Sequence, residues 1–305
     1  MKKNKFKLLI TAIPFLSLDD NIKKLFKKKN INFEILSAVE KFKKKDISRF
    51  DAIIAGVENY DIKKLSGAKN LKIISRVGIG TDNIDTNFCK KRNIQVLKVK
   101  SPFESVAEYT ISAIISSLRN FSSMNYDLHK KIWKPILGKS LSESTVGIIG
   151  YGKIGKLVAK YLKSLNVNKI LVHDIKRFQN ARKIQFCKKI DIFKNSDVIS
   201  LNIDLNKKTK NFISFKEIDF IKKPLSIINT SRGKVINEKA LIYGIKKKKI
   251  NNLFLDVFEK EPYYGQLRKY KNCMMTPHIS SFTNKCRREM ELESIKNLLK
   301  KIKSN

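Results

Sequence analysis

The fold is decided by one stretch of the sequence, Val146-Gly147-Ile148-Ile149-Gly150-Tyr151-Gly152-Lys153-Ile154-Gly155-Lys156. Its apolar first half is typical of a buried strand, and the residues that follow have the periodicity of a helix. In such a unit Gly150 permits a tight turn, Gly152 lets the backbone approach a pyrophosphate, and Gly155 lets helix and strand pack closely. The free N–H groups at the helix start would hold the phosphates. We therefore predict a dinucleotide site made by Gly150, Gly152, Lys153, Ile154 and Gly155.

A carboxylate follows this motif at a spacing that supports the same prediction. A second apolar run, residues 169–174, ends at Asp174, close to the roughly 20 residues at which an acid binds the adenosine ribose hydroxyls. The alternative, a chance glycine loop, does not explain why strand, glycines, helix, strand and acid follow in this order. Because an acid repels a 2′-phosphate, the sequence favours NAD over NADP, although Lys176 and Arg177 follow closely and leave NADP open.

The composition predicts a folded, strongly basic protein. Its 305 residues suggest about two domains, and 42% hydrophobic residues are enough for buried cores. Lys and Arg number 65 against 27 Asp and Glu, a net charge of +38. This excess indicates either a polyanion partner or compositional drift. The basic residues are scattered in short lysine runs and form no stripe interleaved with aromatics. We favour drift and expect no specific nucleic-acid partner.

The cysteines and the N-terminus indicate a cytoplasmic protein. The four cysteines are widely spaced and form no C-x-x-C pair, so we predict reduced thiols, no disulfide framework and no metal site. Residues 1–13 mimic a signal peptide, but Pro14 interrupts the apolar run and two acids follow at once, so we interpret this segment as a first strand. No apolar run is long enough to span a bilayer, and we expect no membrane association.

Short apolar runs alternate with amphipathic ones along the whole chain, which predicts an α/β fold with open parallel sheets. A long apolar helix is expected from Ser101 to Leu118 with Pro102 in its first turn. Residues 119–144 look loose and polar, and residues 283–303 form one amphipathic helix. We expect two Rossmann-like or flavodoxin-like lobes with a cleft between them. The predicted strands are 8–13, 33–36, 51–55, 71–75, 95–99, 146–150, 169–174, 197–203, 225–230, 252–257 and 273–276.

Four polar clusters follow predicted strands, where a parallel sheet presents its site. In the first, residues 75–85, two glycines let the N–H groups of Val77 and Gly78 hold a carboxylate. The alternative is a simple tight turn capped by Asp82. Arg76 either faces a substrate phosphate or braces this turn, and the sequence does not decide between the two.

The other three clusters carry groups suited to chemistry. Arg232 stands between a strand end and Gly233 and can offer a two-pronged contact to a carboxylate and the neighbouring carbonyl. Residues 255–262 place acids at a strand end closed by proline. An imidazole directly after a proline, His278, has little reason to be core packing. Structural roles are assigned to the other two histidines, His129 and His173.

Together these motifs resemble the D-isomer-specific 2-hydroxyacid dehydrogenases, and among them the 3-phosphoglycerate dehydrogenase-like members. The resemblance covers nearly the whole chain and rests on R-V-G-I-G-T-D-N-I-D, S-V-A-E, G-Y-G-K-I-G, N-T-S-R-G-K-V-I-N, L-D-V-F-E-K-E-P and T-P-H-I-S-S, in the family's order. It implies a discontinuous substrate-binding domain, residues 1–101 plus 279–305, and an NAD-binding Rossmann domain, residues 102–278. It also implies NAD as the cofactor, a 2-hydroxy or 2-keto acid as the substrate, and a homodimer formed through the NAD-binding domain.

The resemblance implies residue roles as well. The catalytic positions are matched by Arg232, Glu261 and His278. Asp256 takes the place beside the nicotinamide amide, Asp174 binds the ribose, and Thr230 is a further cofactor contact. The substrate contacts are Arg76, Val77, Gly78 and Arg232.

These roles make chemical sense. A neutral His278 would accept the alcohol proton, and Glu261 would hold the imidazole and stabilise its charged form. Arg232 would anchor the carboxylate and neutralise charge that develops on oxygen.

Two questions stay open in the sequence. The chain reads Asn202-Ile203-Asp204-Leu205-Asn206 where the family commonly has a His-x-Pro-Leu-Thr-like segment, which leaves the cofactor affinity open. The substrate is the second question. 3-Phosphoglycerate with phosphohydroxypyruvate is favoured, and reduction of glyoxylate, hydroxypyruvate or a longer keto acid is the alternative. An NAD-sensing, corepressor-like binding protein is the alternative of another class, against which the intact catalytic set argues.

Overall fold

The computed structural model describes residues 5–100, 103–176 and 179–302. The chain divides into two compact units. Unit 1 consists of Met1–Pro102 and Thr283–Asn305, and unit 2 is the inserted segment Phe103–Phe282. The predicted roles of the two parts, substrate binding and NAD binding, stay predictions. Ser101, Pro102 and Arg177, named in the sequence analysis, lie outside the described residues.

Unit 1 is built on a parallel sheet with the strand order β2-β1-β3-β4-β5. This is the order of flavodoxin-like folds, and it confirms the predicted parallel sheet. The elements are β1 (Phe6–Ile10), α1 (Asp20–Lys28), β2 (Ile31–Ile35), η1 (Val39–Lys44), β3 (Ala52–Ala55), α2 (Ile62–Ser66), β4 (Ile73–Arg76), α3 (Thr86–Lys91), β5 (Gln95–Lys98) and, from the end of the chain, α10 (Asn284–Ile302).

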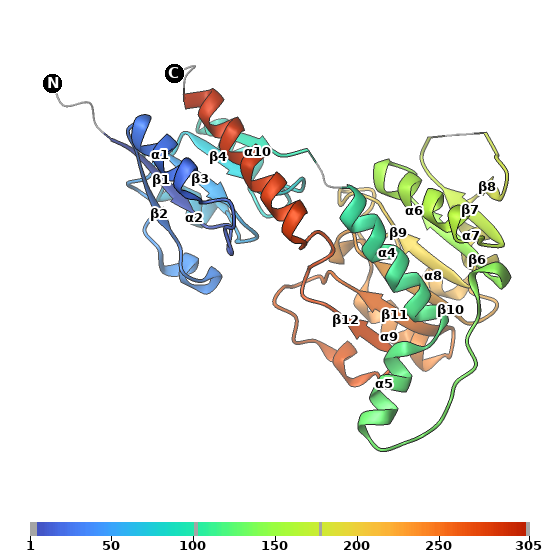
Figure 1. Ribbon diagram of the computed structural model, residues 1–305. Coiled ribbons are helices and arrows are strands. Elements are labelled where there is room, and N and C mark those ends of the chain that lie inside the picture. Colours follow the sequence, from blue (N-terminus) through green and yellow to red (C-terminus); the bar gives the residue numbers. More distant parts are fainter. Residues whose placement is uncertain (1–4, 101–102, 177–178, 303–305) are drawn as a thin grey trace. The chain divides into compact units, whose positions relative to one another are not determined.

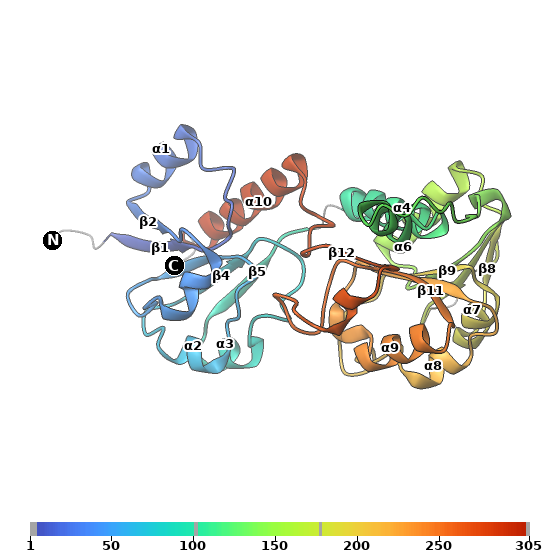
Figure 2. The same cartoon turned by 90° about the horizontal axis from the view of Figure 1, so that it is seen from below.

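Alternation along the strands divides the core of unit 1 between two faces. Leu8 and Ile10 of β1 pack into the core cluster that includes residues of α1 and α10, whereas Leu9 packs into the cluster on the other face with residues of α2 and α3. Figure 2 shows α1 and α10 on one side of this sheet and α2 and α3 on the other. Successive side chains of a strand point to opposite faces, so both layers of helices are needed to bury the sheet.

The last helix is an integral part of unit 1. Cys286, Met290, Ile295 and Leu298 of α10 lie in the same core cluster as residues of β1, β3 and β4. Polar contacts fix its position: Ser75 Oγ donates to Ser294 O at 2.8 Å. The predicted C-terminal amphipathic helix is confirmed, and it completes a sheet whose strands all come from the first hundred residues.

Unit 2 contains a seven-stranded parallel sheet with the order β12-β11-β10-β9-β6-β7-β8. Counted within the unit, six of its strands have the 3-2-1-4-5-6 order of a Rossmann fold. The elements are α4 (Phe103–Leu118), α5 (Phe121–His129), η2 (Leu141–Glu143), β6 (Thr145–Ile149), α6 (Lys153–Ser164), β7 (Lys169–His173), β8 (Ile184–Phe186), α7 (Lys189–Asn195), β9 (Val198–Leu201), α8 (Phe215–Asp219), β10 (Leu225–Asn229), η3 (Gly233–Val235), α9 (Glu238–Lys246), β11 (Ile250–Leu255), η4 (Gln266–Lys269) and β12 (Cys273–Met275).

Helices cover both faces of the second sheet. Figure 2 shows α4 and α6 on one side and α7, α8 and α9 on the other. Two buried clusters fill these layers, one with α4 and α6 against the sheet and one with α7, α8 and α9. A sheet buried on both faces explains why its strands read as continuous apolar runs in the sequence.

Two elements of unit 2 were not predicted. The segment expected to be loose contains α5, whose Asp127 is buried and accepts both contacts from Lys271 Nζ at 2.8 Å. Its sequence is largely polar, so tertiary contacts and not an apolar stripe hold it in place. The short edge strand β8 was missed because three residues give too little alternation to recognise.

Candidate active site

The glycine turn of unit 2 has the geometry that each glycine requires. Gly150 has a φ of +93°, which L side chains rarely adopt, and a Cβ there would collide with the carbonyl of Asn202. A Cβ on Gly155 would collide with the carbonyl oxygen of Gly150. A Cβ on Gly152 would meet nothing within 4 Å. Gly150 and Gly155 are therefore needed by the fold, whereas Gly152 keeps an open space beside the start of α6.

This open space has the donors and acceptors that a dinucleotide requires. No side chain caps the N-terminus of α6, so its first N–H groups are directed to the space in front of Gly152. Asp174 is fixed beside it, because its Oδ2 accepts from Tyr151 N at 2.6 Å and its Oδ1 from Lys176 N at 2.8 Å. Each carboxylate oxygen keeps further lone pairs for ribose hydroxyls.

An unpaired acceptor belongs to the neighbouring loop, after β9. Asn202 follows β9, and its Nδ2 donates to Ser200 Oγ at 3.1 Å. Its Oδ1 is buried and has no hydrogen-bond partner in the protein. A buried acceptor without a donor is costly, so a ligand that donates here would gain from it. The departure from the family's usual sequence therefore leaves an orphaned acceptor on the residue whose backbone carbonyl packs against Gly150, and the residues of the glycine turn fit a dinucleotide.

Glu261 and His278 form a pair at the same edge of the sheet. His278 Nδ1 lies 2.9 Å from Glu261 Oε2, and Glu261 Oε1 accepts from Phe258 N at 2.9 Å. Burial works to raise the pKa of Glu261, but the bond and the charge of His278, the Phe258 N–H and the charge of Arg232 outweigh it, so its pKa lies below the usual value. A carboxylate on Nδ1 fixes the imidazole and leaves Nε2 for a substrate.

Arg232 lies near this pair because its loop packs tightly against the backbone of the loop that carries Glu261. Its loop is closed by Asn229, whose Nδ2 donates to Arg232 O at 3.0 Å. A Cβ on Gly233 would collide with the backbone of Phe258, so only glycine lets the two loops approach this closely. The structure thus brings Arg232, Glu261 and His278 together from the ends of three neighbouring strands, β10, β11 and β12.

Two predicted cofactor contacts have other partners in the structure. The carboxylate of Asp256 is fully buried and accepts three hydrogen bonds from Thr276, Ile279 and Ser280. Thr230 Oγ1 lies 2.9 Å from the hydroxyl of Thr110 on α4. Both side chains hold protein elements together, a role that the resemblance did not indicate.

The predicted substrate residues of unit 1 lie at the end of β4. Val77 N donates to Ala55 O at 3.0 Å, so the sheet already uses this N–H, contrary to its predicted carboxylate contact. Arg76 is half-buried and its Nη1 donates to Val77 O. A Cβ on Gly78, whose φ is +148°, would lie 2.9 Å from Arg76 Nη1. This contact is the one expected if Arg76 braces its turn, and its predicted substrate contact stays a prediction.

A buried polar network at the same edge was missed by the sequence analysis. Thr11 Oγ1 lies 2.6 Å from Tyr60 OH and 2.9 Å from Glu58 Oε2. Glu58 is only 5% exposed, and its other oxygen, Oε1, is buried without a hydrogen-bond partner. Burial raises the pKa of Glu58 and that of Tyr60. The only sequence signal was an acid three residues after the end of a fully buried strand.

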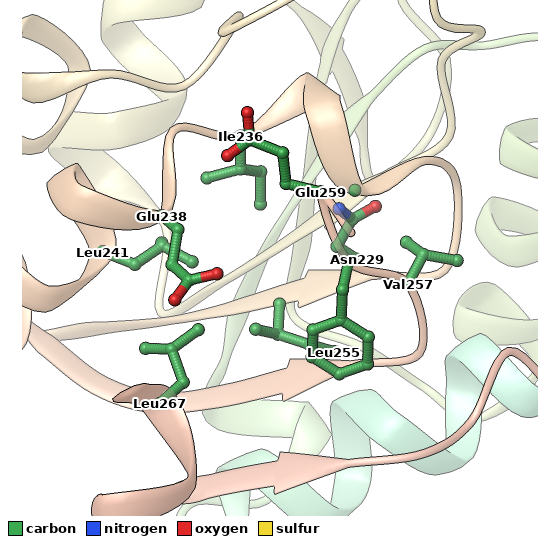
Figure 3. Close-up of a pocket in the computed structure, with 10 residues that line it drawn as sticks. Asn229, Ile236, Glu238, Leu241, Leu255, Val257, Glu259 and Leu267 are labelled. Atoms are coloured by element: carbon green, nitrogen blue, oxygen red, sulfur yellow. The ribbon is translucent and has the colours of Figure 1, made fainter. Parts of the chain in front are cut away.

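A small cavity lies beside the loops that follow β10 and β11 and is lined in part by Asn229, Gly233 and Glu259 (Figure 3). Its volume of about 20 Å³ corresponds to one water molecule. Glu238, which also lines it, accepts from Tyr263 OH at 2.7 Å. This space is a packing gap under the loops and is too small for a cofactor or a keto acid.

Within residues 5–100, 103–176 and 179–302, no helix is long and apolar enough to cross a membrane. The same residues contain no group of three or more His, Cys, Asp or Glu side chains that could hold a metal ion.

Comparisons with known proteins agree with this geometry. Residues 111–280 match the family model described as D-isomer specific 2-hydroxyacid dehydrogenase, NAD binding domain. A hydroxypyruvate reductase of Thermotoga maritima is 33% identical over 245 residues, which are 78% of this chain and 80% of that protein. A D-3-phosphoglycerate dehydrogenase of Archaeoglobus fulgidus is 32% identical over 78% of this chain and 47% of its own length. The crystal structure of D-lactate dehydrogenase from Aquifex aeolicus with NAD and lactic acid superposes with a TM-score of 0.83 at 27% identity, covering 97% of this chain and 96% of that one.

Proposed function

The chain belongs to the D-isomer-specific 2-hydroxyacid dehydrogenases, NAD-dependent oxidoreductases that act on CH–OH groups, and we propose that Arg232, Glu261 and His278 carry out its reaction on a short 2-keto or 2-hydroxy acid. One observation carries the assignment. His278 Nδ1 lies 2.9 Å from Glu261 Oε2, and Arg232 is close enough to lower the pKa of that carboxyl. This reaction needs an imidazole, a carboxylate beside it and a guanidinium. All three lie at the carboxyl edge of the sheet that also carries the glycine turn.

Each group has a separate task. NAD supplies the hydride acceptor, or the donor in its reduced form. His278 accepts the proton of the alcohol oxygen through Nε2, or returns it to the carbonyl oxygen in the reverse direction. Glu261 keeps the imidazole oriented through Nδ1 and stabilises its charged form. Arg232 binds the substrate carboxylate and offsets the charge that develops on oxygen.

The cofactor would be held by the turn around Gly152. The N–H groups of Lys153, Ile154 and Gly155 at the start of α6 would bind the pyrophosphate. Asp174 would accept from ribose hydroxyls, which disfavours a 2′-phosphate.

The substrate that we favour is a small, unphosphorylated keto acid such as hydroxypyruvate or glyoxylate. The support is the position of Arg76, whose guanidinium is folded onto its own turn, and the buried acid Glu58 at the same edge of the sheet. The Thermotoga maritima relative is named for hydroxypyruvate. Phosphohydroxypyruvate is the second candidate, favoured by the Archaeoglobus fulgidus relative.

A substrate panel tests the proposal. The purified protein should oxidise NADH when hydroxypyruvate or glyoxylate is added. The kcat/KM for either of these acids should be at least about tenfold higher than the kcat/KM for phosphohydroxypyruvate. His278→Gln should lower kcat by at least about a hundredfold, because the proton donor is lost. The matched control is His129→Gln, since His129 is exposed on α5 and its Nδ1 lies 2.9 Å from Asn125 O.

Three results would contradict parts of this proposal. A preference for phosphohydroxypyruvate would reverse the choice of substrate. Full activity of His278→Gln would remove the catalytic assignment. NADH that is not consumed with any keto acid would leave the corepressor-like alternative.

We further propose a homodimer formed through unit 2, as the resemblance implies. The chain between α5 and β6 runs as a long extended loop (Figure 1), and its Trp133 and Leu137 are 87% and 97% exposed. Apolar side chains this exposed are typical of a surface that a partner covers. Light scattering should give about twice the 35.2 kDa chain mass. Leu137→Lys should lower that mass, whereas Tyr264→Lys, at an exposed aromatic outside the loop, should not.

We also propose a cytoplasmic location. All four cysteines are free: Cys89, Cys187, Cys273 and Cys286. Reduced thiols are the rule in a reducing compartment.

A further inference from the structure

We propose that Glu291, on the last helix, is a positioning residue for the substrate. Through it α10 holds the loop after β1, residues 11–17, in the shape that bounds the side chain of a short keto acid. The inference rests on the proposed function, because it assigns a further residue to the recognition of that substrate. All the contacts that carry it lie within unit 1.

The loop after β1 stands where an open parallel sheet binds its ligands. In the strand order β2-β1-β3-β4-β5 the direction of winding reverses between β1 and β3. Accordingly α1 and α2, which follow these two strands, lie on opposite sides of the sheet (Figure 2). Ligands bind at such a switch point, outside the carboxyl ends of the strands. The loops after β1 and β3 therefore flank the expected ligand position in unit 1.

Glu291 binds this loop through two backbone donors. Its Oε2 accepts from Leu16 N and from Ser17 N, each at 2.8 Å. On the preceding turn of α10, Arg287 Nη2 donates to Pro14 O at 2.6 Å and lies 3.0 Å from Glu291 Oε1. That second oxygen has the charge of the guanidinium beside it and forms no hydrogen bond within the protein. The loop thus gives one carbonyl and two N–H groups to a single ion pair.

The burial of this ion pair favours a positioning role over a stabilising one. The side chains of Arg287 and Glu291 are only 10% and 0% exposed. Taking two charges out of water is costly, and apolar residues of similar volume are often at least as stabilising in such places. Apolar side chains would fill the space, but only directed hydrogen bonds fix the peptide groups of the loop.

The other end of the loop is also fixed, and its middle presents apolar groups. Thr11 Oγ1 belongs to the buried network with Glu58 and Tyr60. From Ala12 to Leu18 the chain has no charged side chain, and Leu16 is 38% exposed. A wall of this kind suits the short uncharged substituent of hydroxypyruvate and offers no cation to a phosphate.

The test begins with an isosteric variant. Glu291→Gln replaces one carboxylate oxygen by an NH₂ group, which faces either the two loop N–H groups or the Arg287 guanidinium. We expect the KM for hydroxypyruvate to rise at least fivefold, with kcat within twofold and the Kd for NADH unchanged. Glyoxylate has a hydrogen in place of the side chain, so its kcat/KM should stay within twofold of wild type.

The matched control is Asp197→Asn in unit 2. Asp197 is 8% exposed, accepts from Thr145 N at 2.8 Å and pairs with Lys139 at 2.8 Å. It precedes β9 and so lies away from the carboxyl ends of the strands. Because this variant disturbs a comparable set of contacts, a similar loss of Tm is expected, while the KM for hydroxypyruvate should not change.

A second readout does not depend on activity. Amide hydrogen exchange at Leu16 and Ser17 should become at least tenfold faster in Glu291→Gln and stay unchanged in Asp197→Asn. If Glu291→Gln does not fold, the double change Arg287→Met with Glu291→Leu replaces the pair by apolar side chains, which buried sites often tolerate. That variant should fold, accelerate the same exchange and raise the same KM.

The outcomes separate the two proposals. A folded variant with an unchanged KM for hydroxypyruvate overturns the role of Glu291. An equal loss of kcat/KM with hydroxypyruvate and glyoxylate also overturns it, because it would indicate a general disturbance of the active site. If wild type reduces no keto acid, the proposed function fails and this role fails with it. If wild type reduces hydroxypyruvate and the variants keep its KM, only the role of Glu291 fails.

Discussion

Two glutamates, one near the carboxyl end of each sheet, have pKa values shifted in opposite directions. Glu261, after β11 of unit 2, has a pKa below the usual value, since His278, the Phe258 N–H and Arg232 outweigh the effect of burial. Glu58, after β3 of unit 1, has a raised pKa, because burial outweighs the hydrogen bonds from Thr11 and Tyr60 and the more distant Arg76. The surroundings of Glu261 favour its charged form beside cationic groups, whereas the burial of Glu58 favours its neutral form.

The same contrast extends to the two sheet edges. In unit 2 the edge offers groups to a ligand: the uncapped start of α6, the open space at Gly152 and the orphaned Oδ1 of Asn202. In unit 1 the polar groups Thr11, Glu58 and Tyr60 bond to one another inside the protein, and only Glu58 Oε1 in this network has no hydrogen-bond partner. Similar parallel sheets thus carry one edge built for binding and one edge largely closed on itself.

The largest expected effect concerns a glycine at each edge. Gly152→Ala adds a methyl group to open space, so Tm should stay within about 1 °C, while the Kd for NADH rises about tenfold because the pyrophosphate can no longer approach the backbone. Gly56→Ala places a Cβ 2.7 Å from Glu58 Oε1 and 2.9 Å from Ala12 Cα. This overpacking should cost about 1–3 kcal/mol, with the Kd for NADH unchanged. Calorimetry and NADH titration measure both quantities.

The opposite pattern would break the comparison. If Gly152→Ala destabilised the protein without affecting NADH, or if Gly56→Ala weakened NADH binding without loss of Tm, the two edges would not differ in the way described. The result for Gly56 also tests whether the Glu58 carboxylate yields easily, because a mobile side chain would absorb the added methyl group.

A smaller effect is expected in the pH dependence of stability. Because the folded state lowers the pKa of Glu261, its contribution is present above the unfolded value near 4.5 and is lost as pH falls through the folded pKa. Because folding raises the pKa of Glu58, its contribution is present below that value and is lost as pH rises through the folded pKa. The Tm of wild type minus that of Glu261→Gln should therefore rise from pH 4 to 7, whereas the same difference for Glu58→Gln should fall.

Melting curves at four or five pH values suffice for this experiment, and each variant serves as the control for the other. Parallel slopes would mean that the two carboxyl groups have similar surroundings after all. The effect is small for Glu261, since more than a third of its side chain is exposed and solvent screens its partners.

Much of the fold could be predicted from the sequence because the local patterns agree with the final structure. The apolar runs became buried strands, and the pattern Gly150, Gly152 and Gly155 became the turn between β6 and α6. The family, the α/β fold with two parallel sheets and NAD as cofactor are confirmed. Helix α5 was not predicted because its stability comes from Lys271, far away in the sequence.

The site was readable only in part, for the same reason. Arg232, Glu261 and His278 each follow a strand, so topology alone predicts that they share one edge. The partners of Asp256 and Val77 depend on register and on loop conformation, which no local pattern encodes. The network of Thr11, Glu58 and Tyr60 joins groups that only a folded sheet brings together.

The position of α10 also determines the order in which the two units can mature on the ribosome. Unit 2 is one continuous segment, so its core can close as soon as that segment has emerged. The five strands of unit 1 are made first, but the face that receives Met290 and Leu298 stays open until the last helix leaves the exit tunnel. The strands of unit 1 are therefore synthesised before unit 2, but one of their apolar faces is covered only after unit 2 has emerged.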